Sequence, residues 1–172
     1  IDQIVAVGNM LGLGQKSGIP ISGESPGVLP GPEWLSAVNP RARWSNGLTA
    51  NTAIGQGDVL ASPLQMAMVT AAVANGGTVY YPRLVDRIVD QAGKTISQEP
   101  ARVRANIITD GGITVDQMNQ VRKGMLEVVN EGGGTAGRAA NSKMITAGKT
   151  GTAQFWRSGK KDNHTWFICF AP

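Results

Sequence analysis

Four consecutive residues near the end of the chain, Lys149-Thr-Gly-Thr152, carry side chains suited to holding a carboxylate. Lysine supplies a compact positive charge, and threonine hydroxyls can donate hydrogen bonds to the same group. Glycine lets a ligand lie flat against the backbone as an added strand, and a backbone N–H at the strand edge can stabilise an oxyanion. These residues therefore predict an anion-binding strand, although the same letters also suit a turn.

The flanking residues favour an antiparallel hairpin that would hold this stretch. We expect one strand over about 145–155 and a second over 164–170, a run rich in aromatic and β-branched side chains. The residues between them, rich in lysine and glycine, predict an exposed hairpin loop. Alternation places the lysine and the glycine on one face of the first strand and the two threonines on the other. All four can reach one ligand only if this strand is an edge with a cleft running along it.

Three helices are predicted elsewhere in the chain. Residues 1–11 carry apolar side chains at helical spacing. A serine N-cap with Gln65 three residues later predicts a helix over 62–76, and a threonine N-cap with Gln117 predicts another over 114–132. Both of these signals are capping boxes followed by an apolar periodic run.

The remaining segments predict short strands and extended chain. Residues 79–89 read as a strand, followed by a turn over 90–94 and a return strand over about 95–98. The segment 15–52 shows little periodicity, and its prolines forbid a long helix. No internal repeat and no interdomain linker is found among these segments.

The composition suits one globular domain: 172 residues, 41% apolar and 16% charged, with a net charge of +4. The basic residues are scattered apart from Arg157, Lys160 and Lys161, which argues against nucleic-acid binding. The single cysteine, Cys169, excludes an internal disulfide and is expected to be buried. The sequence has no Cys/His cluster for a metal, no cofactor is expected, and no apolar run is long enough to span a membrane.

Three catalytic motifs are matched only in part. Gly23-Glu-Ser-Pro-Gly27 has the spacing of a nucleophile elbow, with Ser25 as nucleophile and His164 as base, but the residue after Ser25 is Pro26, which has no N–H for an oxyanion. The glycines of 132–137 match a dinucleotide fingerprint but follow a helix instead of a strand. Gly148-Lys-Thr resembles the end of a phosphate loop whose first glycine is absent.

The motifs resemble, in the right order and over essentially the whole chain, the transpeptidase domain of class B penicillin-binding proteins. The third family motif and the following strand are matched by Lys149-Thr-Gly-Thr-Ala-Gln154 and Trp166–Pro172. The other matching stretches are Gly12–Gln15, Gly18-Ile19, Gly23-Glu24, Ala53–Gly57, Ala61–Gln65, Ala74–Gly77, Gly124–Asn130 and Gly133–Ala136. The last two resemble the elongation-specific type, penicillin-binding protein 2.

The resemblance implies an α+β fold of the β-lactamase/transpeptidase-like type, in which an antiparallel sheet is flanked by helices. It also implies a serine acyl-enzyme mechanism on peptidoglycan stem peptides, with β-lactams trapping the same serine. It assigns Lys149 to positive potential and proton transfer. It assigns Thr150 and Thr152 to the substrate carboxylate, the Thr152 N–H to the oxyanion hole, and Gly151 to clearance. Gln154 lies further along the same edge with a less defined part in substrate binding.

The family also needs a Ser-x-x-Lys motif on a helix and a Ser-x-Asn motif. Ser158-Gly-Lys-Lys161 comes after the third motif, and Gly159 stands where a helix would be needed. Thr49-Ala-Asn51 only approaches the second motif. We therefore expect residues 1–172 to be the C-terminal part of a single, incomplete transpeptidase domain, inactive alone, with its serine upstream of residue 1.

The resemblance further implies a location on the outer face of the bacterial cytoplasmic membrane, anchored through a segment outside this chain, and partners in the cell-elongation machinery. A non-catalytic β-lactam sensor of the same fold is the alternative, and a folded carrier with residual carboxylate affinity is a third. Sheet edges left unpaired would favour self-association of the fragment.

Overall fold

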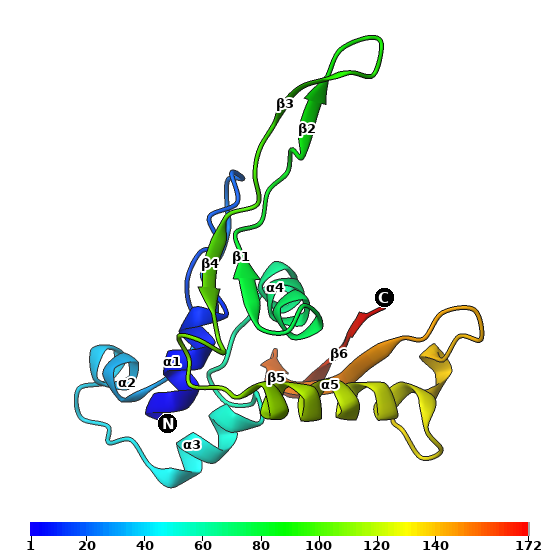
Figure 1. The fold of residues 1–172 in the computed structure, drawn as a ribbon. Coiled ribbons are helices and arrows are strands. Elements are labelled where there is room, and N and C mark those ends of the chain that lie inside the picture. The colour runs from blue at the N-terminus through cyan, green and yellow to red at the C-terminus, as the bar shows by residue number, and fades with distance from the viewer. Residues whose placement is uncertain (172) are drawn as a thin grey trace.

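The computed structural model describes residues 1–171. The helices are α1 (Asp2–Met10), α2 (Pro32–Val38), α3 (Asn46–Ala53), α4 (Pro63–Ala74), α5 (Val115–Asn130) and the short 3-10 helix η1 (Gly137–Ala139). The strands are β1 (Thr78–Tyr80), β2 (Arg87–Val89), β3 (Thr95–Gln98), β4 (Val103–Asn106), β5 (Ala147–Arg157) and β6 (Lys160–Phe170). The α+β prediction is confirmed, with the antiparallel pairing divided into three two-stranded sheets, β1–β4, β2–β3 and β5–β6 (Figure 1).

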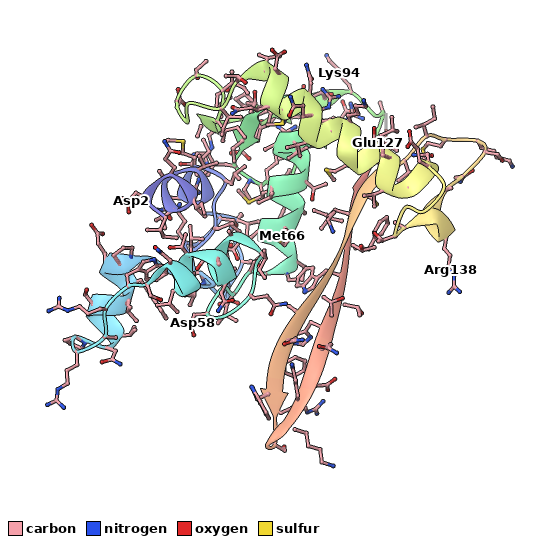
Figure 2. All side chains as sticks on the ribbon, turned by 90° about the horizontal axis from the view of Figure 1, so that it is seen from below. Asp2, Asp58, Met66, Lys94, Glu127 and Arg138 are labelled. Carbon is pink, nitrogen blue, oxygen red and sulfur yellow. The ribbon has the colours of Figure 1, made fainter. Side chains whose placement is uncertain are left out.

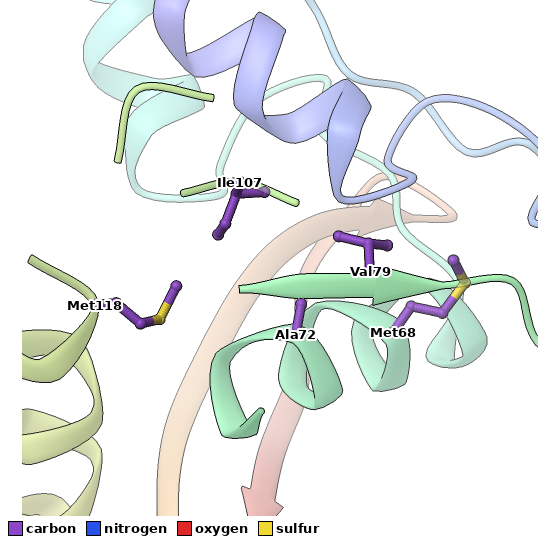
Figure 3. Close-up of a cluster of buried hydrophobic side chains, with 5 residues drawn as sticks. All are labelled: Met68, Ala72, Val79, Ile107 and Met118. Atoms are coloured by element: carbon purple, nitrogen blue, oxygen red, sulfur yellow. The ribbon is translucent and has the colours of Figure 1, made fainter. Parts of the chain in front are cut away.

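The predicted helix over 62–76 is α4, and it lies at the centre of the fold. Its capping box is complete: the Ser62 side chain accepts from the Gln65 N–H, and the Gln65 side chain accepts from the Ser62 N–H. The helix packs against β1 on one side and β6 on another (Figure 1). Figure 3 shows the buried core that results, formed by Met68, Ala72, Val79, Ile107 and Met118.

Gln65 also ties the N-terminal segment to α4. The residue is completely buried, and its Nε2 faces the carbonyl oxygens of Gly12 at 3.1 Å, Gln15 at 3.0 Å and Pro26 at 2.8 Å. Loop carbonyls that lie away from water need such donors, because an unpaired buried polar group is costly. One side chain therefore closes the N-cap of α4 and anchors two turns of the chain that precedes it.

The strand predicted over 79–89 is wrong as a single element. It divides into β1 and β2, with Pro82, which cannot donate to a ladder, between them. β1 pairs with β4, a strand that the sequence did not indicate, and the register shifts at Val79/Tyr80. β2 and β3 form the predicted turn-and-return hairpin, whose residues are all exposed, and it projects away from the rest of the molecule (Figure 1).

The predicted helix over 114–132 is α5, and it packs against β5. Asn130, the last residue of α5, donates from Nδ2 to the carbonyl oxygens of Leu126 at 2.8 Å and Thr146 at 2.9 Å. The chain then turns back so closely that a Cβ on Gly134 would lie 2.4 Å from the Val128 oxygen. Only glycine fits this approach, which brings the 133–136 turn beside the start of β5.

The hairpin at the end of the chain is longer than predicted. β5 and β6 pair without interruption from Ala147↔Phe170 to Arg157↔Lys160. Ser158 and Gly159 alone form the turn, with φ values of 50° and 75°, as in the tight turns that match strand twist. The expected long loop is therefore wrong, because the polar residues of this region are strand residues of a hairpin that extends beyond the helices (Figure 2).

Cys169 is exposed, so the expectation that it is buried is wrong. It alternates along β6 with the half-buried Ile168 and Phe170 and lies on the opposite face. In the segment 15–52, where prolines were expected to prevent a long helix, the structure has only the short helix α2 and most of the short helix α3. Among residues 1–171, no helix combines the length and apolar character that crossing a bilayer requires.

We expect replacement of Gln65 by Met to lower the free energy of unfolding by about 3 kcal/mol or more, since each buried group left without a partner costs roughly 1–3 kcal/mol. Gln117→Met is the matched control, because Gln117 closes the same capping box on α5 but is exposed. It should cost less than about 1 kcal/mol. The free energy of unfolding is measured by denaturant titration. An equal decrease in both variants would show that the contacts of Gln65 with buried carbonyls do not stabilise the fold.

The pKa of Glu24 is lowered, first by a hydrogen bond from the Ser17 side chain and then by the Ser17 N–H, which it accepts at 2.8 Å. A carboxyl whose pKa is lower in the folded than in the unfolded protein stabilises the fold above its unfolded pKa, and this contribution disappears as pH falls through the folded pKa. Glu24→Gln should therefore lower Tm at pH 7 and make no difference in strong acid. Asp58→Asn makes the same carboxyl-to-amide change at an exposed position and is the control, which should leave Tm at pH 7 nearly unchanged.

Candidate functional site

A groove of about 240 Å³ runs between the β5–β6 hairpin and the segment that joins α3 to α4. Its lining residues are Ile54, Gly55, Val59, Ala61, Met66, Lys149, Thr150, Gly151, Thr152, Ala153, Trp166 and Ile168. The structure thus brings together four of the five residues singled out from the sequence. The fifth, Gln154, lies two residues further along β5 and is exposed.

β5 has one edge free of any strand. Within the part of the chain that the structure describes, its ladder partner is β6 alone. The side chain of Gln56 donates to the Thr152 oxygen at 2.9 Å and accepts from the Gln154 N–H at 3.3 Å. These two backbone groups therefore point away from β6. Because the N–H and C=O of one strand residue point to the same edge, the Thr152 N–H also faces the free edge.

Lys149 lies at one end of this edge and is exposed. Its Nζ donates to the Thr150 oxygen at 2.5 Å, and neither ion pair found among residues 1–171 involves it. An ammonium without a carboxylate partner beside a groove with apolar walls attracts an anion, since fewer water dipoles oppose its field there.

The hydroxyl of Thr150 is held by a second threonine. Thr135, in the turn after α5, lies with its Oγ1 2.8 Å from the Oγ1 of Thr150, and either can be the donor. This contact depends on the close turn at Gly134 described above. The Thr150 hydroxyl is thereby oriented from a different element, with capacity left for a further hydrogen bond.

The two glycines of β5 serve different purposes. A Cβ on Gly148 would lie 2.8 Å from two ring atoms of Phe167 and 2.9 Å from the Ile168 oxygen, so packing within the hairpin requires glycine there. A Cβ on Gly151 would meet only the Trp166 Cβ, at 3.4 Å. The fold itself tolerates a side chain at Gly151, and the space it leaves open is on the groove side.

The apolar side of the groove comes from β6 and α4. Trp166 and Ile168 are half-buried and stand on the same face of the hairpin as Gly151 and Lys149, their cross-strand partners. Met66 of α4, labelled in Figure 2, lines the same groove. Of the described residues that line the groove, none is a serine, cysteine or histidine. The groove can bind and polarise an acyl group with a carboxylate, but a nucleophile with a base is not among these residues.

The catalytic look-alikes do not assemble into a site. The Ser25 Oγ accepts from the Gly27 N–H at 3.2 Å in a local turn, while His164 stacks on Phe155 with ring centroids 4.0 Å apart. Ser158 sits in the hairpin turn and not on a helix. The glycines of 132–137 form the turn after α5.

Two residues in contact with the β5 edge, Gln56 and Thr135, had no role in the sequence analysis. Both fall in stretches that carried the family resemblance, Ala53–Gly57 and Gly133–Ala136. That position was the only signal available, because their contacts join residues 96 and 15 positions apart.

Known proteins with similar sequences identify the family of this chain. The family model for the penicillin-binding protein transpeptidase domain matches residues 2–172. The peptidoglycan D,D-transpeptidase MrdA of Acinetobacter baumannii is 33% identical over 188 residues, which cover 100% of this chain and 26% of that protein. The chain thus spans about a quarter of the length of the curated relatives it matches.

Solved structures agree with this result. Pseudomonas aeruginosa PBP2, in complex with WCK 5153, superposes with a TM-score of 0.75 and 32% identity, over 100% of this chain and 36% of that one. Helicobacter pylori PBP2, in complex with MreC, gives a TM-score of 0.73 and 30% identity, over 94% of this chain and 27% of that one. The chain belongs to the penicillin-binding protein transpeptidase family, as a fragment of a class B transpeptidase domain.

Proposed function

We propose that residues 1–172 form one wall of the acylation cleft of a peptidoglycan D,D-transpeptidase, as the C-terminal part of its single transpeptidase domain. The observation that carries the proposal is the free edge of β5 beside a groove, with an outward N–H at Thr152 and with the ammonium of Lys149, which has no carboxylate partner among residues 1–171. The nucleophilic serine belongs to another part of the full-length protein, since the groove residues described here include none.

In the proposed reaction, the serine Oγ attacks the penultimate D-Ala carbonyl of a stem peptide, and the serine proton passes to a base. The C–N bond to the terminal D-Ala breaks, that amine takes a proton, and an amine from a second stem peptide then displaces the serine from the acyl-enzyme. Lys149 supplies positive potential and takes part in proton transfer. The Thr152 N–H stabilises the oxyanion at each tetrahedral intermediate.

Substrate binding in this proposal falls to the remaining residues of the strand. The hydroxyls of Thr150 and Thr152 hold the terminal carboxylate of the stem peptide or of a β-lactam. The Thr135 contact supports this role, because it fixes the rotamer of Thr150 before a ligand arrives. Gly151 leaves clearance for the ligand backbone, and Gln154 extends the same edge.

The names of the relatives support the wider setting. Because relatives across this chain are called peptidoglycan D,D-transpeptidases and one structure holds MreC, we place the full-length protein on the outer face of the bacterial cytoplasmic membrane, anchored by a segment outside these residues. Its partners would be peptidoglycan stem peptides, β-lactams and the cell-elongation machinery.

Covalent labelling of the full-length protein by a fluorescent penicillin tests the proposal. Lys149→Ala should slow acylation by roughly 10²–10³-fold, since it removes the charge that stabilises the bound anion and the reacting groups. Lys143→Ala is the control, because Lys143 is also exposed but lies before β5. Equal rates for the two variants would remove Lys149 from the site. If the unaltered full-length protein is not labelled, the transpeptidase proposal is wrong. The sensor alternative would then hold only if the protein still binds β-lactams noncovalently.

The 172-residue chain by itself should remain unlabelled under the same conditions. The reason is that its wall of the cleft binds but has no nucleophile. Mass spectrometry of the treated chain checks this, and a covalent adduct on any of its serines would show that the nucleophile is inside residues 1–172.

The two glycines of β5 give a paired test. Gly151→Ala should leave Tm nearly unchanged, because its Cβ meets only the Trp166 Cβ at an ordinary distance, yet acylation should slow by roughly 10²-fold as the ligand is displaced from the strand. Gly148→Ala should instead destabilise the protein by about 1–3 kcal/mol through overpacking against Phe167. A Gly151 variant that acylates normally would contradict the assigned clearance.

A further inference from the structure

Gln56 contacts the β5 edge as a neighbouring strand would. A single side-chain amide donates to the Thr152 oxygen at 2.9 Å and accepts from the Gln154 N–H at 3.3 Å. On an added antiparallel strand, the Thr152 oxygen would accept from the N–H of the residue opposite Thr152, and the Gln154 N–H would donate to the C=O of the residue opposite Gln154. The Gln56 amide therefore takes the place of one C=O and one N–H that would come from two consecutive peptide groups of that strand.

The local chain is built to present Gln56 in this position. Gln56 follows α3, and its own N–H donates to the Asn51 oxygen at 2.9 Å. The glycines on either side, Gly55 and Gly57, have φ values of 70° and 71°, which residues with a Cβ rarely adopt. The two left-handed positions turn the chain out and back, so that Gln56 projects toward β5 and is half-buried.

Side chains of the described residues already bond three backbone groups of the free edge of β5. Lys149 Nζ covers the Thr150 oxygen, and Gln56 covers the Thr152 oxygen and the Gln154 N–H. The Thr152 N–H lies between these contacts and is not used by β6. A ligand can place an oxyanion at this N–H without disturbing Gln56, but it can reach the adjacent Thr152 oxygen only by competing with the Gln56 amide.

We propose that Gln56 is a specificity-determining residue of this groove, whose side-chain amide competes with an amide N–H of the ligand for the Thr152 oxygen. The inference rests on the proposed function. A ligand residue directly opposite Thr152 would exchange both hydrogen bonds with it, its C=O accepting and its N–H donating. Gln56 selects against the second bond and so weakens the preference for ligands that carry that N–H.

The test uses the full-length protein and two β-lactams that share one ring system. Benzylpenicillin has an amide N–H one carbon from its reacting carbonyl, whereas penicillanic acid has hydrogen at that position. Second-order acylation rate constants are measured for each, by competition with a fluorescent penicillin. Removing the competing amide, in Gln56→Ala and in the length-matched Gln56→Met, should raise the benzylpenicillin/penicillanic acid ratio by about 2- to 10-fold, the worth of one hydrogen bond.

Asp58→Ala is the matched control, because Asp58 lies in the same segment, is exposed, and should leave the ratio unchanged. Hydrogen exchange of the Gln154 amide gives a second readout, which should quicken in both Gln56 variants and stay constant in the control. An unchanged or lower ratio, unchanged exchange, or failure of both Gln56 variants to fold would overturn the inference. Absence of acylation by either compound in the unaltered protein would instead overturn the proposed function.

Discussion

The structure depends on one constraint: β5 must keep one edge free of any strand while the rest of the strand is held in place. An exposed edge is normally a hazard, because its unpaired backbone groups attract other chains. Here its other edge is fully paired with β6 along eleven registered positions. Asn130 fixes its N-terminal approach through the Thr146 oxygen, and side chains of Lys149 and Gln56 cover the carbonyls of the free edge. The edge is protected by groups that a ligand can displace.

The opposite wall of the groove is held by buried polar contacts as much as by apolar packing. α4 presents Met66 to the hairpin, and the position of α4 depends on Gln65, which is completely buried and faces three loop carbonyls. The core cluster adds the apolar contacts between α4, β1 and α5 (Figure 3). One wall of the groove is therefore a paired hairpin, and the other is the segment between α3 and α4 together with Met66 of α4.

Electrostatics and shape act together at this edge. The ion pairs found within residues 1–171 join Arg83 to Asp86 and Lys123 to Glu127, neighbours in sequence at the surface. Lys149 has no such partner there, so its charge is available to an incoming carboxylate. Apolar walls from Trp166 and Ile168 reduce screening by water, and the absence of a side chain at Gly151 leaves the backbone of β5 open on the groove side.

The sequence by itself determined the elements whose signals are local. Capping boxes at Ser62 and Thr114 located α4 and α5, and the hairpin predicted from the residues on either side of Lys149 located β5 and β6. These predictions succeeded because a cap or a strand alternation is decided by residues a few positions apart. The motif order also identified the family, since it spans the whole chain.

The tertiary structure alone decided which distant groups meet. Nothing near Gln56 or Thr135 in the sequence specifies a contact with β5, because those hydrogen bonds join segments up to 98 positions apart. The split of the 79–89 segment, the exposed Cys169 and the length of the terminal hairpin likewise depend on which partners each strand finds. Residues close together in the sequence determine whether a segment forms a helix or a strand. Packing between distant segments determines which backbone and side-chain groups meet, and the groove beside β5 results from that packing.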